Sequence, residues 1–274
     1  MTLNNKVAIV TGGGGRGCGQ AMATRIARDG AAVVVADVNE AAAADVAGRL
    51  TAAGLRAMAA AADVSREEDV RRLFTRAEET LGGVDFVVNN ASALVFPETS
   101  FDDAFANLHV DLLGAMLMTR WGIEALRRRG GGAIVNIGST SALAHGDPRA
   151  HGSSSTGYNT AKAAIQRFTT TLAWMGPAEN IRVNCLVPHW IGTEHIKAEV
   201  ARMTAEERRQ WEVPDVLISP EEIADAVLRL AFDTRLAGRL MVWYGGQSPQ
   251  LIPFGDRGYV SLGDLPQDSA NISM

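Results

Sequence analysis

A serine, a tyrosine and a lysine near the middle of the chain have the types and the spacing that proton transfer requires. Tyr158 and Lys162 are four residues apart, so a helix over 158–176 would place the phenol and the ammonium on the same face. A free tyrosine titrates at about 10, and a nearby cation favours the phenolate, which brings the group closer to the pH at which general acid–base catalysis is efficient. Ser139 follows an apolar run, and its hydroxyl could hold a carbonyl or alcohol oxygen beside the phenol. An exposed helix pair is the plainer alternative, so the interpretation depends on the elements around this stretch.

The composition is that of an ordinary globular protein with room for a full hydrophobic core. The chain has 274 residues, of which 47% are hydrophobic and 21% charged, and a single α/β domain of this size is common. A net charge of −5 leaves no basic stripe for phosphates, which argues against a nucleic-acid partner. The two cysteines give no disulfide framework, and the sequence contains neither a signal-peptide pattern nor the roughly 20 apolar residues of a membrane span. We therefore expect a cytoplasmic protein with no membrane partner.

A glycine-rich turn follows the first predicted strand. The apolar run 6–11 is typical of a buried parallel strand, and the helical pattern 20–29 comes directly after the turn. Such a turn lets the backbone approach a pyrophosphate, whose charge the helix N-terminus stabilises. A simple tight turn is the alternative, but the position between the first strand and the first helix favours nucleotide binding. The glycines that carry this prediction include Gly12, Gly15, Gly17 and Gly19.

An acidic residue ends the second predicted strand, which covers 32–37. Asp37 lies 18 positions after Gly19, close to the place where a carboxylate binds a ribose 2′-hydroxyl. It would repel a 2′-phosphate, and the next two residues carry no compensating cation, which favours NAD over NADP. Arg16 is the opposing feature, because it could reach the adenosine end. A helix N-cap is the alternative role for Asp37.

Strand and helix patterns alternate along the rest of the chain. This alternation predicts an α/β fold, a Rossmann-like doubly wound parallel sheet of about seven strands with helices on both faces, in three α/β/α layers. Asn90 and Ala91 follow the fourth strand, where polar amides suit either cofactor contact or loop stabilisation. Capping-box patterns at 65–68, 204–207 and 219–222 predict helix starts. The further predicted elements are strands over 55–62, 84–88, 133–137, 181–187 and 240–244, and a long helix over 101–129.

In this order, the elements resemble those of the short-chain dehydrogenase/reductase family, in its compact single-domain branch. The match covers roughly residues 5–246. The resemblance implies a Rossmann fold, a nicotinamide cofactor, and hydride transfer between a secondary alcohol or ketone and the nicotinamide ring. The motifs that carry it are Thr11-Gly12…Gly17-Cys18-Gly19, Asp63-Val64, Asn89-Asn90-Ala91, Ser139, Tyr158…Lys162, Asn184 and Pro188.

The resemblance also assigns roles to residues. It implies Tyr158 as the general acid/base, Ser139 as the residue that orients the reacting oxygen, and Lys162 as the residue that holds the nicotinamide ribose and lowers the tyrosine pKa. It implies a single domain over 1–246 with a substrate lid at about 189–218, an extension over 247–274, and a homodimer or homotetramer. No metal site is expected. The cofactor contacts that it implies are Gly12, Gly15, Arg16, Gly17, Gly19, Asp37, Asp63, Val64, Asn90, Ala91, Tyr158, Lys162, Pro188, Ile191 and Thr193.

The sequence departs from the family pattern around the proposed chemistry. Asp111 stands where the family usually has an asparagine that anchors a water, and its charge could tie up Lys162; Asn107, one turn earlier, is an alternative for that role. The glycine turn has one extra residue. Ser139 and Tyr158 are 19 positions apart, so the intervening residues must form an extra loop, and Pro188 is followed by histidine and tryptophan instead of glycine.

These observations leave one leading hypothesis and two alternatives. The leading one is an NAD-dependent oxidoreductase that acts on a small-molecule secondary alcohol or ketone, which the lid composition suggests is mainly apolar. A catalytically impaired nicotinamide-binding sensor or scaffold is the first alternative, motivated by Asp111 and the altered glycine turn. An epimerase or dehydratase is the second, but such relatives usually carry a larger substrate domain. The extension over 247–274 is compatible with disorder or with packing on a neighbouring surface.

Overall fold

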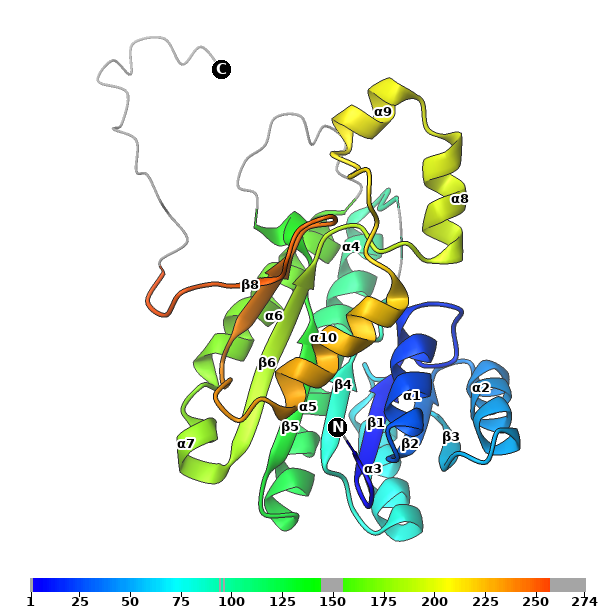
Figure 1. The fold of residues 1–274 in the computed structure, drawn as a ribbon, viewed down its shortest axis with the longest axis vertical. Coiled ribbons are helices and arrows are strands. Elements are labelled where there is room, and N and C mark those ends of the chain that lie inside the picture. Colours follow the sequence, from blue (N-terminus) through cyan, green and yellow to red (C-terminus); the bar gives the residue numbers. More distant parts are fainter. Residues whose placement is uncertain (1, 94, 96, 144–154, 257–274) are drawn as a thin grey trace.

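The computed structural model describes residues 2–93, 95, 97–143 and 155–256, and within these ranges an eight-stranded sheet lies between two layers of helices (Figure 1). The strand order is β3-β2-β1-β4-β5-β6-β7-β8, and neighbours are parallel except for β7 and β8. The expected doubly wound α/β fold is therefore confirmed, with one strand more than expected. The strands are β1 Val7–Thr11, β2 Ala32–Asp37, β3 Ala57–Ala61, β4 Phe86–Asn89, β5 Gly132–Ile137, β6 Ile181–Pro188, β7 Leu240–Trp243 and β8 Gln250–Leu251.

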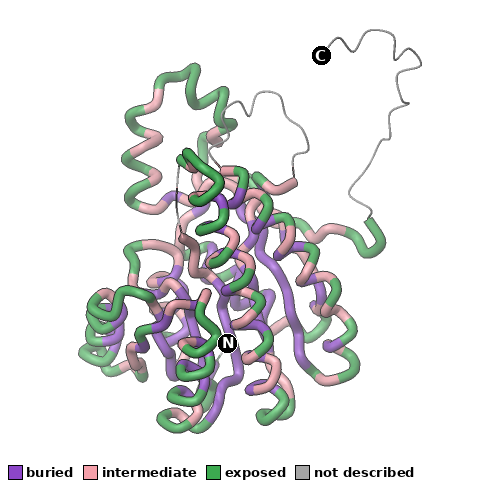
Figure 2. Tube along the Cα trace, turned by 180° about the vertical axis from the view of Figure 1, so that it is seen from behind, coloured by how far each residue is buried: buried purple, intermediate pink, exposed green. Residues whose placement is uncertain are grey.

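The central strands are buried because both of their faces are covered. All residues of β1, β4 and β6 are buried, which agrees with the mainly apolar sequences of β1 and β4, whereas β6 also buries the polar Arg182 and Asn184. Figure 2 shows this as a buried centre surrounded by more exposed helices. The described helical elements are α1 Cys18–Arg28, α2 Glu40–Ala52, α3 Glu67–Leu81, α4 Phe101–Asn107, η1 Leu108–Gly114, α5 Ala115–Arg128, η2 Thr140–Ala142, α6 Thr156–Thr171, α7 Met175–Glu179, α8 Glu194–Arg202, α9 Ala205–Gln210 and α10 Pro220–Phe232.

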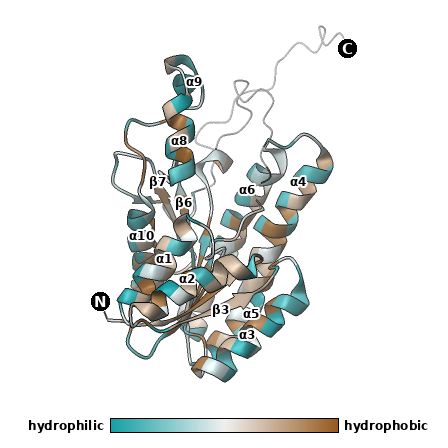
Figure 3. Cartoon of the chain, turned by 90° about the vertical axis from the view of Figure 1, so that its right-hand side faces the viewer, coloured by the Kyte–Doolittle hydropathy of each residue, from teal (hydrophilic) through white to brown (hydrophobic). Residues whose placement is uncertain are grey.

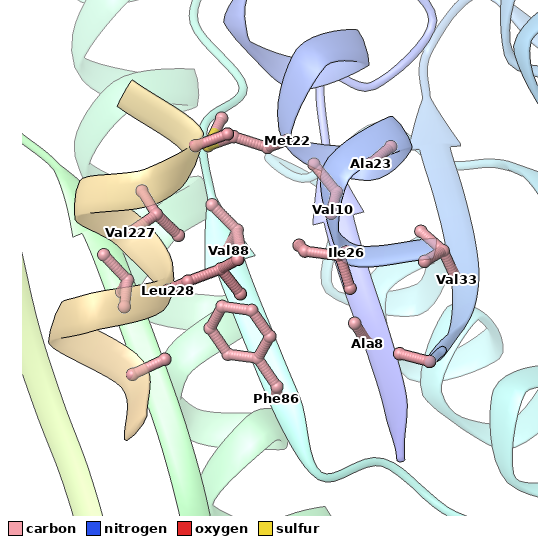
Figure 4. Close-up of a cluster of buried hydrophobic side chains, with 14 of the residues drawn as sticks. Ala8, Val10, Met22, Ala23, Ile26, Val33, Phe86, Val88, Val227 and Leu228 are labelled. Carbon is pink, nitrogen blue, oxygen red and sulfur yellow. The ribbon is translucent and has the colours of Figure 1, made fainter. Parts of the chain in front are cut away.

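Helices of the two layers pack on opposite faces of the sheet. Helices α1, α2 and α10 cover one face, and α3, α5 and α6 cover the other (Figure 3). On the first face, Ile26 of α1 and Val227 of α10 meet Phe86 of β4 in one apolar cluster (Figure 4). Each of these three side chains is at most 1% exposed, so each contributes about 1.5–3 kcal/mol of burial free energy. This packing fixes the strand ends from which the site is built.

The predicted long helix over 101–129 is not a regular α-helix. The structure divides it into α4, a π-helical segment η1 and α5, with helical backbone angles at both junctions. A π-helical turn is rare and often lies at a functional site, because its wider spacing redirects side chains. Asp111 lies in this segment and is buried.

The predicted caps are confirmed at two helices and wrong at a third. Capping boxes at Thr204 and Ser219 start α9 and α10 as expected. At α3 the N-cap residue is Arg66, without a side-chain capping bond, while the Ser65 hydroxyl donates to the Asp63 carboxylate at 2.6 Å. A hydrogen bond to a charged oxygen is stronger than one to a neutral group, which explains why the Ser65 hydroxyl bonds to Asp63 and does not cap α3.

Strand β8 lies inside the stretch that the sequence assigns to a C-terminal extension. It pairs antiparallel with β7, with Leu251 opposite Met241. Arg239 donates to the carbonyl of Ile252 at 2.9 Å and stacks on the ring of Phe254 at 4.1 Å. The start of the extension therefore widens the sheet. Within the part of the chain that the structure describes, no helix is long and apolar enough to cross a membrane.

Candidate functional site

The glycine-rich turn between β1 and α1 forms one wall of the site. Gly12 has φ +63°, and a Cβ on Gly19 would lie 2.1 Å from the Gly12 carbonyl oxygen, so a side chain at Gly19 would clash with that carbonyl. A Cβ on Gly15 would have no neighbour within 4 Å, and Gly15 and Arg16 are exposed. The turn is therefore tightly packed at both ends and open in the middle.

Asp37 closes this turn from the end of β2. Its carboxylate accepts hydrogen bonds from the backbone amides of Gly14 at 2.9 Å and Asn39 at 3.0 Å. The N-cap of α2 is Asn39, whose side chain accepts from the amide of Ala42. The capping alternative for Asp37 is therefore wrong, and its carboxylate lies directly beside the glycine turn.

The loop after β4 meets the glycine turn through Thr11. The Thr11 hydroxyl accepts from the amides of Asn90 at 3.0 Å and Ala91 at 3.1 Å. The Asn90 side chain donates in turn to the carbonyls of Thr11 at 2.9 Å and Gly12 at 3.3 Å. Since β1 and β4 are the strands at which the sheet reverses its order, these contacts lie at the topological switch point, where open α/β sheets bind ligands.

Other predicted cofactor residues lie at neighbouring strand ends. Val64 is buried, and a Cβ on Gly114 would come within 2.6 Å of its side chain, so Val64 packs against the end of η1. Asp63 accepts from the amide and the hydroxyl of Ser65. Thr193 is the N-cap of α8, and its methyl group would lie 3.8 Å from a Cβ on Gly17, so it faces the glycine turn.

Two more predicted residues begin the connection from β6 to α8. Pro188 ends β6 opposite Trp243 of β7, and Ile191 forms a parallel bridge with Ile218. The indole of Trp190 donates to the carbonyl of Trp211 at 3.2 Å, which ties the start of this connection to the end of α9. Helices α8 and α9 contain no buried residue and project from the body of the molecule (Figure 1).

Lys162 is buried at the centre of the proton-transfer group. Its ammonium donates to the carbonyl of Ile137 at 3.1 Å, lies 3.5 Å from Asp111 Oδ2, and lies 5.3 Å from the centre of the Tyr158 ring. Burial alone would lower the pKa of Lys162, but the charges of Asp111 and Tyr158 outweigh it and raise that pKa above its usual value. Lys162 is therefore a cation at neutral pH, and the predicted helix face is confirmed.

Asp111 is fully engaged by hydrogen bonds. Its two oxygens accept from the Ser92 hydroxyl at 2.8 Å and the Ala93 amide at 3.0 Å, in addition to the contact with Lys162. This geometry agrees with the expectation that the negative charge of Asp111 interacts with Lys162. The Asn107 side chain bonds to the backbone of Val95 and to the Glu98 carboxylate, and none of these contacts involves Lys162.

Ser139 lies two residues after the end of β5 and is the N-cap of η2. Its hydroxyl lies 2.8 Å from the hydroxyl of Ser141 and accepts from the Ser141 amide at 3.2 Å. Its carbonyl accepts from the buried side chain of Gln166 at 2.9 Å. Gln166 was missed by sequence reasoning, although Tyr158, Lys162 and Gln166 repeat every four residues, and that spacing was the available signal.

A second residue that sequence reasoning missed is Glu98, whose carboxylate accepts from the backbone amides of Gly157 and Tyr158. No local pattern in the sequence predicts this contact, because 60 positions separate Glu98 from Tyr158. Most of the predicted extra loop between Ser139 and Tyr158, including its two histidines, lies outside the described residues. Among the residues that are described, no group of three or more His, Cys, Asp or Glu could hold a metal ion.

Comparison with known proteins agrees with this geometry. A family model described as short chain dehydrogenase matches residues 6–204. A probable short-chain type dehydrogenase/reductase of Bradyrhizobium diazoefficiens is 36% identical over 93% of this chain and 92% of its own length. The cis-4-hydroxycyclohexanecarboxylate dehydrogenase of Sinomonas cyclohexanicum is 33% identical over 88% of this chain and 96% of its own length.

Two solved structures of hydroxysteroid dehydrogenases are similar to this chain. A 7α-hydroxysteroid dehydrogenase complexed with NADH and 7-oxo glycochenodeoxycholic acid has a TM-score of 0.78 and 28% identity, and the alignment covers 89% of this chain and 95% of that one. A hydroxysteroid dehydrogenase from Escherichia coli has a TM-score of 0.75, also at 28% identity, over 90% of this chain and 98% of that one. The glycine turn at the switch point, the buried lysine beside a tyrosine and these similarities lead to one conclusion: the chain belongs to the short-chain dehydrogenase/reductase family of nicotinamide-dependent oxidoreductases.

Proposed function

We propose that this protein is an NAD-dependent oxidoreductase that interconverts a secondary alcohol and a ketone, with Tyr158 as its general acid/base. The observation that carries the proposal is the buried ammonium of Lys162, 5.3 Å from the centre of the Tyr158 ring and anchored by the Ile137 carbonyl. A fixed positive charge beside a phenol favours the phenolate, which a plain structural pair on a helix surface would not require.

The glycine turn and Asp37 fit a dinucleotide. Gly12 and Gly19 bring backbone close to backbone at the start of α1, and the space around Gly15 is open, as a pyrophosphate requires. Asp37 presents a carboxylate that the Gly14 and Asn39 amides hold in place at the end of β2. That fixed negative charge suits a ribose hydroxyl and disfavours a phosphate, which supports NAD over NADP. When bound, the nicotinamide supplies the hydride acceptor or donor.

In the proposed mechanism, the side chains of this protein move one proton and orient one oxygen. Tyr158 takes the hydroxyl proton during alcohol oxidation and returns a proton to the oxygen during ketone reduction. Ser139 donates a hydrogen bond to the same oxygen, for which its hydroxyl turns away from Ser141. Lys162 stays protonated throughout, because the carboxylate of Asp111 and the carbonyl of Ile137 stabilise its charge.

The proposed substrate has an apolar body and enters beside the lid over 189–218. Trp190, bonded to Trp211, contributes an aromatic side chain to this connection next to the end of β6. Two of the similar proteins are named for a hydroxysteroid and a hydroxycyclohexanecarboxylate, which are both cyclic alcohols. We therefore expect ring-bearing secondary alcohols to be among the substrates.

Turnover with a panel of secondary alcohols tests the proposal. The protein is incubated with NAD and each alcohol, and formation of NADH is followed by its absorbance; Tyr158→Phe should abolish turnover while NADH still binds. The contact between Asp111 and Lys162 favours one alternative, an impaired sensor in which the aspartate holds the lysine away from its role. That alternative predicts NADH fluorescence enhancement without turnover on any alcohol, unchanged in Tyr158→Phe.

A further inference from the structure

The first turn of α6, which carries Tyr158, is capped by a carboxylate from a distant segment. Glu98 lies in the loop between β4 and α4, and its Oε2 and Oε1 accept from the amides of Gly157 and Tyr158, both at 2.8 Å. Two consecutive amides of the helix start therefore bond to one carboxylate.

This contact supplies what the helix start lacks locally. The first four amides of an α-helix have no intrahelical acceptor, and a negative charge near them also interacts favourably with the helix dipole. The N-cap residue Ser155 provides no side-chain capping bond. Gly157 moreover packs so closely on α4 that an added Cβ would lie 2.1 Å from the Ala104 carbonyl. The first turn of α6 is thus held between α4 and Glu98.

Glu98 is itself held by a buried side chain. The Asn107 amide donates to Glu98 Oε1 at 2.7 Å, and Asn107 is only 1% exposed. The same amide group donates to the carbonyl and accepts from the backbone amide of Val95, at 3.0 and 3.2 Å. Burial opposes ionisation of Glu98, but the hydrogen bonds from the α6 amides and from Asn107 outweigh it and keep its pKa below the usual value. The carboxylate is therefore charged at neutral pH.

We propose that Glu98 is a positioning residue, which fixes the first turn of α6 so that the phenol of Tyr158 stands in its working place relative to Lys162 and Ser139. This inference rests on the proposed role of Tyr158. One of the amides that Glu98 binds belongs to Tyr158 itself, so a shift of this turn displaces the phenol directly. Lys162, one turn later, is held independently by Ile137 and Asp111, so the pair would separate rather than move together.

Two substitutions at Glu98 test the proposal. Glu98→Ala removes every one of these bonds, whereas Glu98→Gln keeps one acceptor oxygen and turns amide hydrogens toward helix amides. Because displacements of about 1 Å can cost on the order of 100-fold in rate, we expect kcat to fall at least about tenfold in Glu98→Ala and less in Glu98→Gln. The affinity for NADH, measured by fluorescence titration, should stay within about twofold, since the glycine turn and Asp37 are untouched.

Glu222→Gln is the matched control. Glu222 closes the capping box of α10 with its carboxylate on the Ser219 amide at 2.8 Å, so this variant also loses a helix cap, but on the opposite face of the sheet. It should lower Tm by an amount similar to that of Glu98→Gln and leave kcat unchanged. A kcat that falls equally in the two variants would mean that lost stability explains the effect, and would overturn the proposal.

The remaining outcomes separate this inference from the proposed function. If both Glu98 variants keep wild-type kcat while Tyr158→Phe is inactive, the positioning role is wrong and the function of Tyr158 stands. If Tyr158→Phe retains turnover, the proposed function itself fails. If Glu98→Ala does not fold, the comparison of Glu98→Gln with Glu222→Gln decides the question alone, and a loss of NADH affinity in proportion to kcat would again contradict positioning.

Discussion

Two neighbouring groups keep the buried Lys162 protonated. The Ile137 carbonyl and the Asp111 carboxylate both lie within 3.5 Å of its ammonium. Such a buried pair keeps the lysine protonated, but the negative charge of Asp111 also offsets the field that Lys162 exerts on the phenol. The two effects have opposite consequences for proton transfer at Tyr158, which makes Asp111 the most informative residue of the site.

The first prediction concerns Asp111→Asn. The amide keeps an acceptor for Ser92 or Ala93 but removes the negative charge, so the ammonium acts on the phenol without compensation. We expect kcat/KM for alcohol oxidation to be equal to or higher than that of the wild type at neutral pH, and its acid limb to move to lower pH. The measurement is the pH profile of kcat/KM in both proteins. A limb that moves to higher pH, or complete loss of activity, would show that Asp111 is needed to keep Lys162 charged.

The second prediction concerns the choice of cofactor. Asp37→Ala removes the carboxylate that lies beside the glycine turn, so the repulsion of a 2′-phosphate disappears. We expect the ratio of kcat/KM with NAD to kcat/KM with NADP to fall by about tenfold or more, the scale of one charged contact. Because the substitution also loosens the Gly14 amide, both values should decrease, and the ratio is the informative quantity. An unchanged ratio would reject the assignment of Asp37.

Helix α6 contains contacts that the sequence predicts and contacts that it does not. The spacing of Tyr158 and Lys162 was sufficient to predict their common face, because helix geometry is local. The contact of Glu98 with this helix comes from a residue 60 positions away, so no pattern of neighbouring residues predicts it. Gln166, by contrast, continues the four-residue spacing of Tyr158 and Lys162, and only its partner, the Ser139 carbonyl, is distant in sequence. The π-helical segment around Asp111 was likewise missed, because its seven residues are too few to set an apolar period of their own.

The third prediction concerns the link between α6 and the end of β5. Gln166→Leu removes the hydrogen bond to the Ser139 carbonyl, which keeps a weaker one from the Ala142 amide at 3.3 Å. We expect a loss of about 1 kcal/mol in unfolding free energy and a fall in kcat/KM, since Ser139 is less firmly held. Chemical denaturation and steady-state kinetics measure the two effects. Arg167→Leu, at the adjacent exposed position, is the control and should change neither the unfolding free energy nor kcat/KM. An unaltered kcat/KM in Gln166→Leu would show that Gln166 does not support Ser139.

At the scale of the whole molecule, the candidate residues lie together because the carboxyl ends of the parallel strands all point to the same side of the sheet. Asp37 ends β2, and the glycine turn, Asn90 and Ser139 follow the carboxyl ends of other strands, which is why alternating patterns in the sequence were enough to predict that they meet. The eighth strand was not foreseen, since Gln250 and Leu251 are too few to form a recognisable pattern. Its antiparallel pairing depends on the proximity of β7.

The last prediction concerns assembly. Phe101 and Phe105 of α4 are 74% and 52% exposed with ring centres 6.2 Å apart, and Leu113 and Met116 are exposed further along the same helical rod. Exposed apolar side chains such as the Phe101 and Phe105 pair are typical of an interaction surface, which supports the expected homodimer or homotetramer. We expect the wild type to be oligomeric by light scattering after gel filtration, and Phe101→Ser with Phe105→Ser to shift it toward the monomer. Val38→Ser removes an equally exposed apolar side chain from the segment between β2 and α2 and should leave the mass unchanged. A monomeric wild type would refute this role of the α4 surface.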